Sequence, residues 1–232
     1  MSPFRRTRQY TSRARAYNTR LVTPPSDYWN RVAETKTFCH PLDVDRVAML
    51  VPRDARILDL GCGYGRTLAQ LAALGYHRLV GIDTAGAMVA RGRRQYPDLD
   101  LRVLAPGPLP FADATFDAVL LIAVLTCVPA DDDQRTLVAE VHRVLRPGGL
   151  LYLTDFLLAA DERNVARYRE GTGRFPRYGV FEHPEGVVLR HHDPRWIREL
   201  TSGFGEVSFA EFAATTMNGN PAHGFQFVGG RI

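Results

Sequence analysis

Cysteine and long apolar runs are scarce in this chain of 232 residues. The three cysteines, Cys39, Cys62 and Cys127, are odd in number and lack the spacing of metal ligands, so we expect reduced thiols in a cytoplasmic protein. No apolar stretch reaches the roughly 18 residues that a membrane span requires. The amino terminus is polar and basic, so we expect no secretory signal. We therefore expect a protein without disulfides, metal or membrane contact.

Acidic residues are absent from the first 20 positions, which hold six arginines, whereas lysine occurs only once in the whole chain, at Lys36. The formal net charge is +4, so the rest of the chain is mildly acidic. We expect residues 1–25 to form a basic, disordered leader. A basic arm can also bind phosphate backbones, which leaves a nucleic-acid partner as an alternative. The arginines are Arg5, Arg6, Arg8, Arg13, Arg15 and Arg20.

Residues 56–65 are the most informative segment of the sequence. They read Arg-Ile-Leu-Asp-Leu-Gly-Cys-Gly-Tyr-Gly, a short buried strand that ends in an acid and is followed by glycine at every second position. Gly61, Gly63 and Gly65 allow a tight turn and a close approach to a ligand, because no Cβ stands in the way. A helical pattern then begins near Thr67. The segment predicts a strand, a loop that binds a nucleoside, and a helix.

A second strand ends in an acid at Asp83, 22 residues after Gly61. An acid at this point is placed to accept hydrogen bonds from ribose hydroxyls. The glycine spacing and the acid Asp59, two residues before Gly61, both depart from the nicotinamide-binding pattern. A carboxylate at residue 59 suits a ligand with a positive pole better than a pyrophosphate.

Four motifs in order resemble those of class I S-adenosylmethionine-dependent methyltransferases. They are residues 59–65, Asp83, the pair Leu-Pro-Phe at 109–111 and Phe-Asp at 116–117, and Leu-Arg-Pro-Gly-Gly at 145–149. The resemblance covers residues 50–156 and implies S-adenosylmethionine as cofactor. The overall pattern is similar to that of bacterial methyltransferases of specialised metabolism. The cofactor-binding positions that it implies are Tyr28, Asp59, Gly61, Cys62, Gly63, Gly65, Asp83, Thr84, Met88, Leu109 and Ile122.

The predicted fold is an α/β, doubly wound, seven-stranded and mostly parallel sheet within a single domain over residues 26–232. We expect helices over residues 26–50 as an amino-terminal cap and an insertion over residues 157–200 as a substrate cap. Three adjacent acids at 131–133 favour a helix start by the macrodipole rather than a metal site. The predicted strands are 57–60, 79–83, 101–104, 118–122, 149–155, 207–212 and 225–228.

Histidines are the candidates for a general base, because imidazole titrates near neutral pH. His183, His191 and His192 lie in the predicted insertion, and His40 lies in the other cap segment. Each of them also has a plain interpretation as a packing or surface histidine. Their spacing does not support metal ligation.

The predicted function is transfer of a methyl group to an oxygen, nitrogen or carbon of a small metabolite by in-line displacement. Two alternatives stay open: an RNA or protein methyltransferase that uses the arginine arm, and a non-catalytic protein that binds S-adenosylmethionine. Residues 122–125, after the fourth strand, lack the motif of enzymes that methylate exocyclic base nitrogens, which argues against nucleic acid. A homodimer is compatible with the sequence.

Overall fold

A seven-stranded sheet forms the centre of the computed structural model, which describes residues 25–104 and 107–232. Its strand order is β3-β2-β1-β4-β5-β9-β8. Strands β1 to β5 pair in parallel, whereas β9 is antiparallel to both β5 and β8. The predicted doubly wound, mostly parallel sheet is confirmed. The strands are β1 (Arg56–Leu60), β2 (Arg78–Asp83), β3 (Asp100–Val103), β4 (Phe116–Ile122), β5 (Leu145–Phe156), β8 (Phe204–Thr215) and β9 (Pro221–Arg231).

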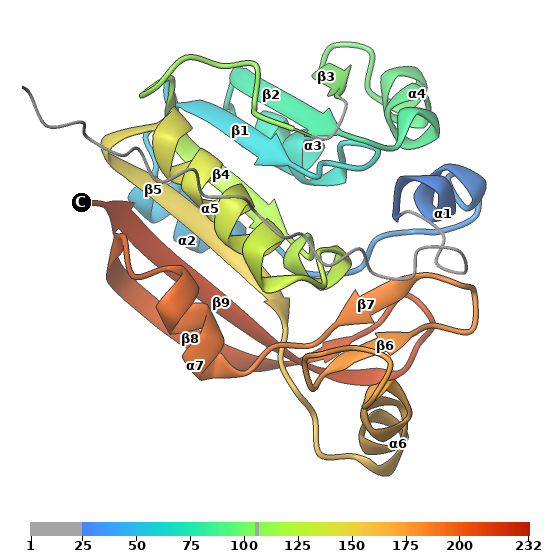
Figure 1. Cartoon of the computed structure of the whole chain (residues 1–232). Helices are drawn as coiled ribbons and strands as arrows, with labels where there is room; N and C mark the ends of the chain where they lie inside the picture. Colours follow the sequence, from blue (N-terminus) through green and yellow to red (C-terminus); the bar gives the residue numbers. More distant parts are fainter. Residues whose placement is uncertain (1–24, 105–106) are drawn as a thin grey trace, which may run out of the picture.

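Helices cover both faces of this sheet (Figure 1). Along β4, Val119 and Leu121 pack into the cluster that includes α5 and α7, whereas Ala118 and Leu120 pack into the cluster that includes α2 and α3. This alternation follows from the two-residue period of a strand, and burial on both faces explains why the strand is apolar throughout. The helices are α2 (Val44–Leu50), α3 (Arg66–Ala73), α4 (Gly86–Gln95), α5 (Asp131–Val144) and α7 (Pro194–Leu200).

The insertion after β5 contains two elements that the sequence pattern did not predict, the strands β6 (Val180–Glu182) and β7 (Val188–Arg190). They pair as a separate antiparallel hairpin. Helix α6 (Glu162–Gly171), which the sequence did predict, packs against β6. Its amino end is capped by Asp161, whose side chain accepts a hydrogen bond from the backbone of Asn164. The hairpin was missed because three-residue strands are too short to show a period.

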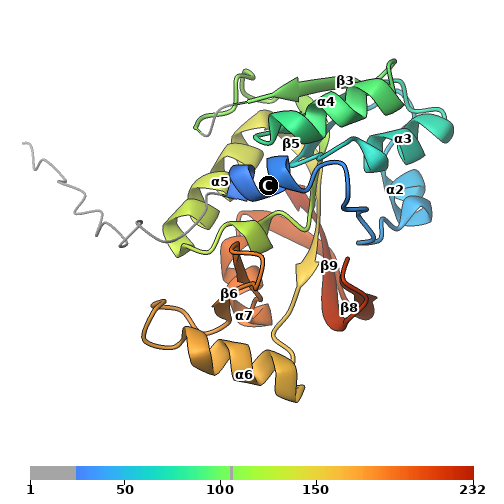
Figure 2. The same ribbon diagram turned by 90° about the vertical axis from the view of Figure 1, so that its right-hand side faces the viewer.

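Helix α1 (Pro25–Arg31) packs against α4, beyond the carboxyl ends of the parallel strands. Figure 2 shows it on the side of the molecule that also carries the hairpin and α6. The predicted leader lies outside the described residues except for its last position, and the proposed domain limits stay a prediction. No helix in the described part of the chain is long and apolar enough to cross a membrane.

Candidate cofactor and acceptor site

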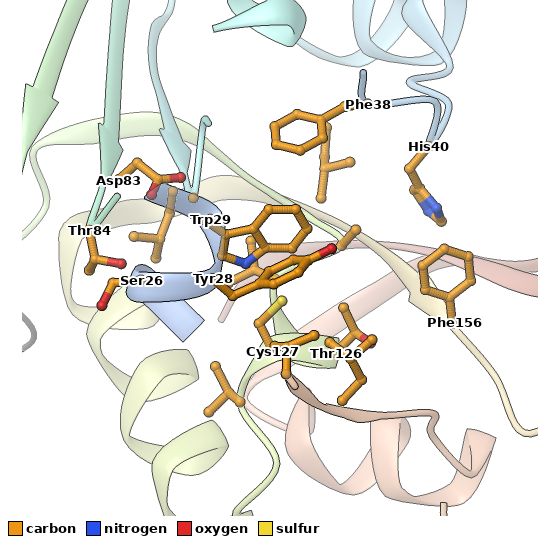
Figure 3. A pocket seen from close by; sticks show the side chains of 18 of the residues that line it. Ser26, Tyr28, Trp29, Phe38, His40, Asp83, Thr84, Thr126, Cys127 and Phe156 are labelled. Atoms are coloured by element: carbon orange, nitrogen blue, oxygen red, sulfur yellow. The ribbon is translucent and has the colours of Figure 1, made fainter. Parts of the chain in front are cut away.

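A cavity of about 890 Å³ lies at the carboxyl ends of β1, β2, β4 and β5. Ligands bind at this edge in open α/β sheets, and the volume is at the upper end of the range of small-molecule sites. Figure 3 shows side chains from α1, from the following loop and from the strand ends facing one another around it. Predicted site residues that line the cavity are Tyr28, His40, Asp59, Gly61, Cys62, Asp83, Thr84, Met88, Leu109, Ile122, His183 and His191.

Asp83 orders the glycine loop as well as facing the cavity. Its Oδ2 accepts a hydrogen bond of 2.8 Å from the backbone N–H of Gly63, and its Oδ1 accepts one of 2.7 Å from that of Ala85. Burial raises the pKa of this carboxyl, and the backbone donors oppose the rise. Each oxygen can still accept a further bond, because a carboxylate oxygen has two lone pairs. Asp83 therefore fits a pair of ribose hydroxyls, with Thr84 and the buried Met88 beside it.

The space above Gly63 is filled by the protein itself. Gly63 has φ +54°, and a Cβ at this position would lie 2.1 Å from Cε2 of Phe38. The Phe38 ring stacks on Tyr64 at a centroid distance of 4.9 Å. The lack of a side chain at Gly63 thus makes room for Phe38 of the cap segment. The sequence did not predict this contact. Gly65 is the N-cap of α3 and faces leucine side chains, and neither Gly63 nor Gly65 lines the cavity.

Asp59 is 2% exposed, and its Oδ2 has no hydrogen-bond partner among the described residues. Burial, together with the nearby Asp83, raises its pKa to about 7, and Arg66 opposes this rise. An unpaired buried carboxylate is unfavourable unless a cation neutralises it. The ammonium group of an amino acid would satisfy Asp59, so this end of the cavity fits the amino-acid end of S-adenosylmethionine.

His40 presents an unprotonated nitrogen to a buried environment. The hydroxyl of Thr154 donates its only proton to the carbonyl of Phe225 at 2.7 Å, so it accepts the hydrogen bond of 2.8 Å from Nε2 of His40. Nδ1 of His40 is then a lone pair, and it has no partner in the part of the chain that the structure describes. Burial and the neighbouring Arg66 lower the pKa of His40 to about 4. His40 is therefore neutral near pH 7 and able to accept a proton at Nδ1.

The other three predicted histidines have different surroundings. His191 is buried at the cavity wall, where Nδ1 lies 2.6 Å from the hydroxyl of Tyr168. His183 lies in the turn between β6 and β7 and contacts Asn218 at 3.2 Å. His192 does not line the cavity: its Nδ1 lies 3.0 Å from the carbonyl of Phe156, and its Nε2 lies 2.9 Å from Nε2 of Gln134.

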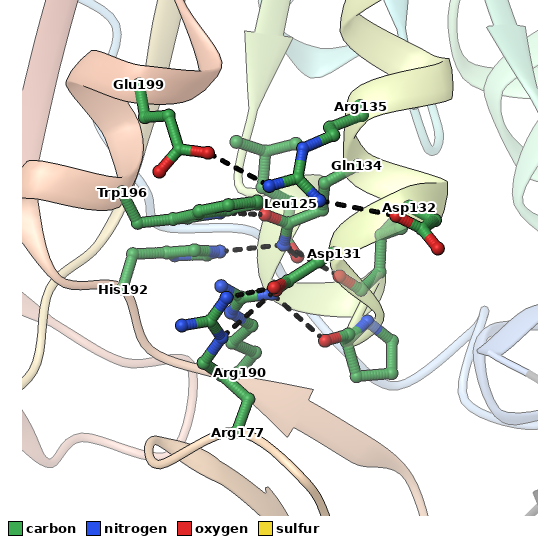
Figure 4. Close-up of polar contacts among 12 residues, drawn as sticks. Leu125, Asp131, Asp132, Gln134, Arg135, Arg177, Arg190, His192, Trp196 and Glu199 are labelled. Carbon is green, nitrogen blue, oxygen red and sulfur yellow. Dashed lines mark hydrogen bonds and ion pairs between the residues drawn. The ribbon is translucent and has the colours of Figure 1, made fainter.

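A polar network joins α5 to the insertion (Figure 4). Asp131, in the first turn of α5, pairs with Arg177 and with the buried Arg190, whose Nη1 lies 2.7 Å from Oδ1 of the acid. Gln134 accepts a hydrogen bond of 2.6 Å from the indole of Trp196. The acids at 131–133 begin the helix as predicted, and no group of potential metal ligands occurs among the described residues. This network fixes the hairpin, and with it one wall of the cavity.

Sequence reasoning missed several residues of the cavity wall. Phe156 ends β5, and Arg163 and Arg167 lie on α6. Met217 and Asn218 come from the turn between β8 and β9. The helix and the turn were predicted, but their orientation depends on the insertion, for which the sequence pattern gives no packing partner. Cys127, predicted only as a free thiol, also lines the cavity.

Comparison with known proteins connects this site to one family. Residues 58–153 match a family described as "Methyltransferase domain". A 27-O-demethylrifamycin SV methyltransferase of Amycolatopsis mediterranei is 34% identical over 155 residues, which are 62% of this chain and 56% of that protein. A demethylmenaquinone methyltransferase of Beutenbergia cavernae is 41% identical over 102 residues, which are 44% of this chain and 40% of that protein.

A solved structure agrees over most of the chain. A SAM-dependent methyltransferase of Methanosarcina mazei has a TM-score of 0.77 at 25% identity, and the match covers 84% of this chain and 99% of that one. Fold and site together define an α/β protein whose cavity fits a nucleoside. Over residues 58–153 the chain is similar to a methyltransferase domain, and over most of its length it is similar in structure to a SAM-dependent methyltransferase. It spans only about half the length of the curated relatives it matches.

Proposed function

We propose that this protein transfers a methyl group from S-adenosylmethionine to an oxygen, nitrogen or carbon of a small metabolite. The observation that carries the proposal is one cavity with two unlike halves. The nucleoside half contains Asp59 and Asp83 at the ends of adjacent strands, and the other half contains His40, Phe156 and His191. Two ligands held end to end in this way satisfy the geometric need of a direct transfer.

When bound, S-adenosylmethionine supplies a methyl group activated by a positive sulfur. Asp59 would hold the ammonium group, and Asp83 the ribose. Orientation of two reactants in one site can contribute about 7–11 kcal/mol of the barrier reduction, so a displacement of this kind needs little covalent help from the protein. The aromatic side chains Trp29 and Phe38, which contact each other at 5.6 Å between ring centroids, would exclude water from the cofactor half.

His40 would take the proton of the acceptor. Nδ1 of His40 would hold the proton that the acceptor hydroxyl or amine gives up, while its Nε2–H would stay bonded to Thr154. The imidazolium that forms lies near Arg66, and this repulsion favours loss of the proton to solvent. His191 would form part of the acceptor wall. His192 would have a structural role in the core, because both of its ring nitrogens make hydrogen-bond contacts there.

The names of the relatives support an oxygen acceptor, and we place the reaction in specialised metabolism. Relatives whose names carry an O-methylation include the rifamycin enzyme and an O-methyltransferase of Aspergillus nomiae that is 34% identical over 127 residues. We extend this class to the present chain. The thiols of Cys39, Cys62 and Cys127 are free, which supports a reducing, cytoplasmic location.

Calorimetry with S-adenosylmethionine and S-adenosylhomocysteine tests the cofactor half. Incubation with radiolabelled methyl donor and an extract of small metabolites then tests transfer. We expect binding of both nucleosides and label in an organic-soluble product. Binding without any transfer would favour a non-catalytic protein, and no binding of either nucleoside would overturn the proposal.

An RNA or protein substrate stays the alternative, and the lack of a base-methylation motif at residues 122–125 makes the nucleic-acid case the weaker one. Deletion of residues 1–20 separates the two cases, because turnover of a small molecule should be unchanged. Salt-dependent binding to RNA that disappears with the arm would favour the alternative.

A further inference from the structure

Arg167 places a positive charge in the wall of the acceptor half. It lies on α6, lines the cavity, and its guanidinium carbon is 3.8 Å from the ring centroid of Phe181. Its Nη2 donates to Oδ1 of the buried Asn164 and lies 3.4 Å from Nε2 of His191. Asn164 in turn donates to Asp161. The guanidinium is therefore held in one orientation before any ligand arrives.

Donors of this guanidinium remain unused. Nε of Arg167 is buried and has no partner among the described residues, and no carboxylate in the same part of the chain forms an ion pair with it. Burial lowers its pKa. Arg190, which is buried more deeply, pairs with Asp131. A partly buried guanidinium that forms no ion pair within the described residues would be stabilised by an anion that a ligand supplies.

Charges around the cavity are divided by element. The insertion contributes Arg163 and Arg167 and no acid to the wall, and the third arginine of the wall, Arg66, comes from α3. Every acidic residue of the wall comes from β1, β2 or α5, namely Asp59, Asp83, Asp133 and Glu140. An anion would thus be attracted to the side of the cavity formed by the insertion and repelled by the two carboxylates of the nucleoside half.

A row of rings connects this charge to His40. The ring of Phe156 contacts that of His40 at 4.8 Å and stacks on that of His191 at 5.6 Å, measured between centroids. His191 in turn lies beside Arg167. A planar acceptor of about two fused rings could lie along Phe156, with its nucleophile at His40 and its opposite end at Arg167.

We infer that the acceptor is a planar, largely apolar carboxylate, whose nucleophilic group faces His40 and whose carboxylate pairs with Arg167. This inference rests on the proposed function, since it assigns the two ends of the acceptor in that site. Nη1 of Arg167 forms no hydrogen bond within the described residues, so it can donate a charge-assisted bond to this carboxylate. Arg167 then determines which metabolites enter in the productive direction.

The probe that tests this inference is 6-hydroxy-2-naphthoate, which carries a hydroxyl and a carboxylate at opposite ends of two fused rings. Its neutral analogue is 6-hydroxy-2-naphthamide. Binding of both is measured by calorimetry in the presence of S-adenosylhomocysteine. We expect the wild-type protein to bind the acid about tenfold or more tightly than the amide, as for a charge-assisted pair. Arg167→Met should bring this ratio close to one, and Arg167→Lys should leave it intermediate.

The matched control is Arg169→Met, because Arg169 is exposed on the same helix and should leave the ratio unchanged. An acid that binds no better than the amide, or that fails to bind at millimolar concentration, overturns the inference. So does a preference that survives Arg167→Met. Affinity for S-adenosylhomocysteine is measured for every variant, so loss of nucleoside binding identifies failure of the proposed function separately.

Discussion

At the scale of single residues, two atoms without partners define what the cavity can hold. Within the described part of the chain, Oδ2 of Asp59 has no partner and would be stabilised by a cation, and Nδ1 of His40 has no partner and can accept a hydrogen bond from a donor. The sequence predicted Asp59 and Asp83 because acids that follow parallel strands meet at one edge of the sheet. The sequence indicated His40 as one of four candidate histidines and did not distinguish it from the other three. The tautomer that singles out His40 depends on Thr154 and Phe225, which are more than a hundred residues away.

Replacement of Asp83 by alanine should weaken binding of S-adenosylhomocysteine by about 1.5–3 kcal/mol, the range for a hydrogen bond to a charged group. The same change removes the acceptor for Gly63 and Ala85, so the loop loses order as well. Calorimetry measures the effect. Asp98→Ala is the control, since Asp98 is exposed on the turn before β3. Equal affinity of the Asp83 variant and the wild type would contradict the assignment.

Replacement of His40 by asparagine should lower kcat by roughly 10²–10⁴-fold for a hydroxyl acceptor, the usual contribution of a general base. The wild type should keep its activity down to about pH 5, because the pKa of His40 is lowered to about 4 and the ring stays neutral above it. The variant should instead gain activity with rising pH, as the acceptor ionises without help. Steady-state rates between pH 5 and 9 measure this.

The exposed His77 provides the control for the His40 variant, and His77→Asn should leave the rate unchanged. If the His40 variant has the wild-type rate, another group must accept the proton.

At the scale of elements, the cap and the insertion meet at Glu185, in the turn between β6 and β7. Its carboxylate accepts hydrogen bonds from the hydroxyl of Tyr28 and, at 2.8 Å, from Nζ of Lys36. Its backbone carbonyl accepts one of 3.0 Å from Arg31. Both the helix with Tyr28 and the histidine-rich insertion were predicted as caps. Their contact was not, because it joins residues about 150 positions apart and leaves no local pattern.

Replacement of Glu185 by alanine should loosen α1 over the cavity and speed release of S-adenosylhomocysteine several-fold, up to about tenfold. Stopped-flow fluorescence of Trp29, which lines the cavity, measures the rate. Glu170→Ala removes an exposed acid from α6 and should have no effect. An unchanged release rate would show that α1 does not control exit.

At the scale of the whole molecule, the sequence predicted the main sheet but only part of the wall. Alternating strands and helices, with glycine and acid at the strand ends, determine the doubly wound order. His191 and His192 show the limit of this reasoning. Neighbours in extended chain point to opposite sides, so one faces the cavity and the other the core, and nothing in the sequence tells which.

The buried His192 should make folding sensitive to acid. Burial, with Arg190 nearby, lowers its folded-state pKa to about 3, below the value of 6.5 for a free histidine. Between these values the unfolded state binds more protons, so the free energy of unfolding falls as pH decreases, by at most about 1.4 kcal/mol per pH unit. Asp59 and Asp155, whose pKa values are raised to about 7, act in the opposite direction.

Comparison of the wild type with His192→Asn isolates this effect, since both proteins keep the two acids. Urea unfolding from pH 7 to pH 4 should show a steeper loss of stability in the wild type. Parallel curves would mean that His192 titrates normally.

Lys36 is the only lysine of the chain, and it binds both Glu185 of the insertion and Asn218 of the turn between β8 and β9. The sole side-chain amine is thus located where three distant segments converge. A reagent that acylates primary amines would attach a dye at this junction with only the terminal amine competing. Reactivity of that single amine should then report, in solution, how often the three segments separate.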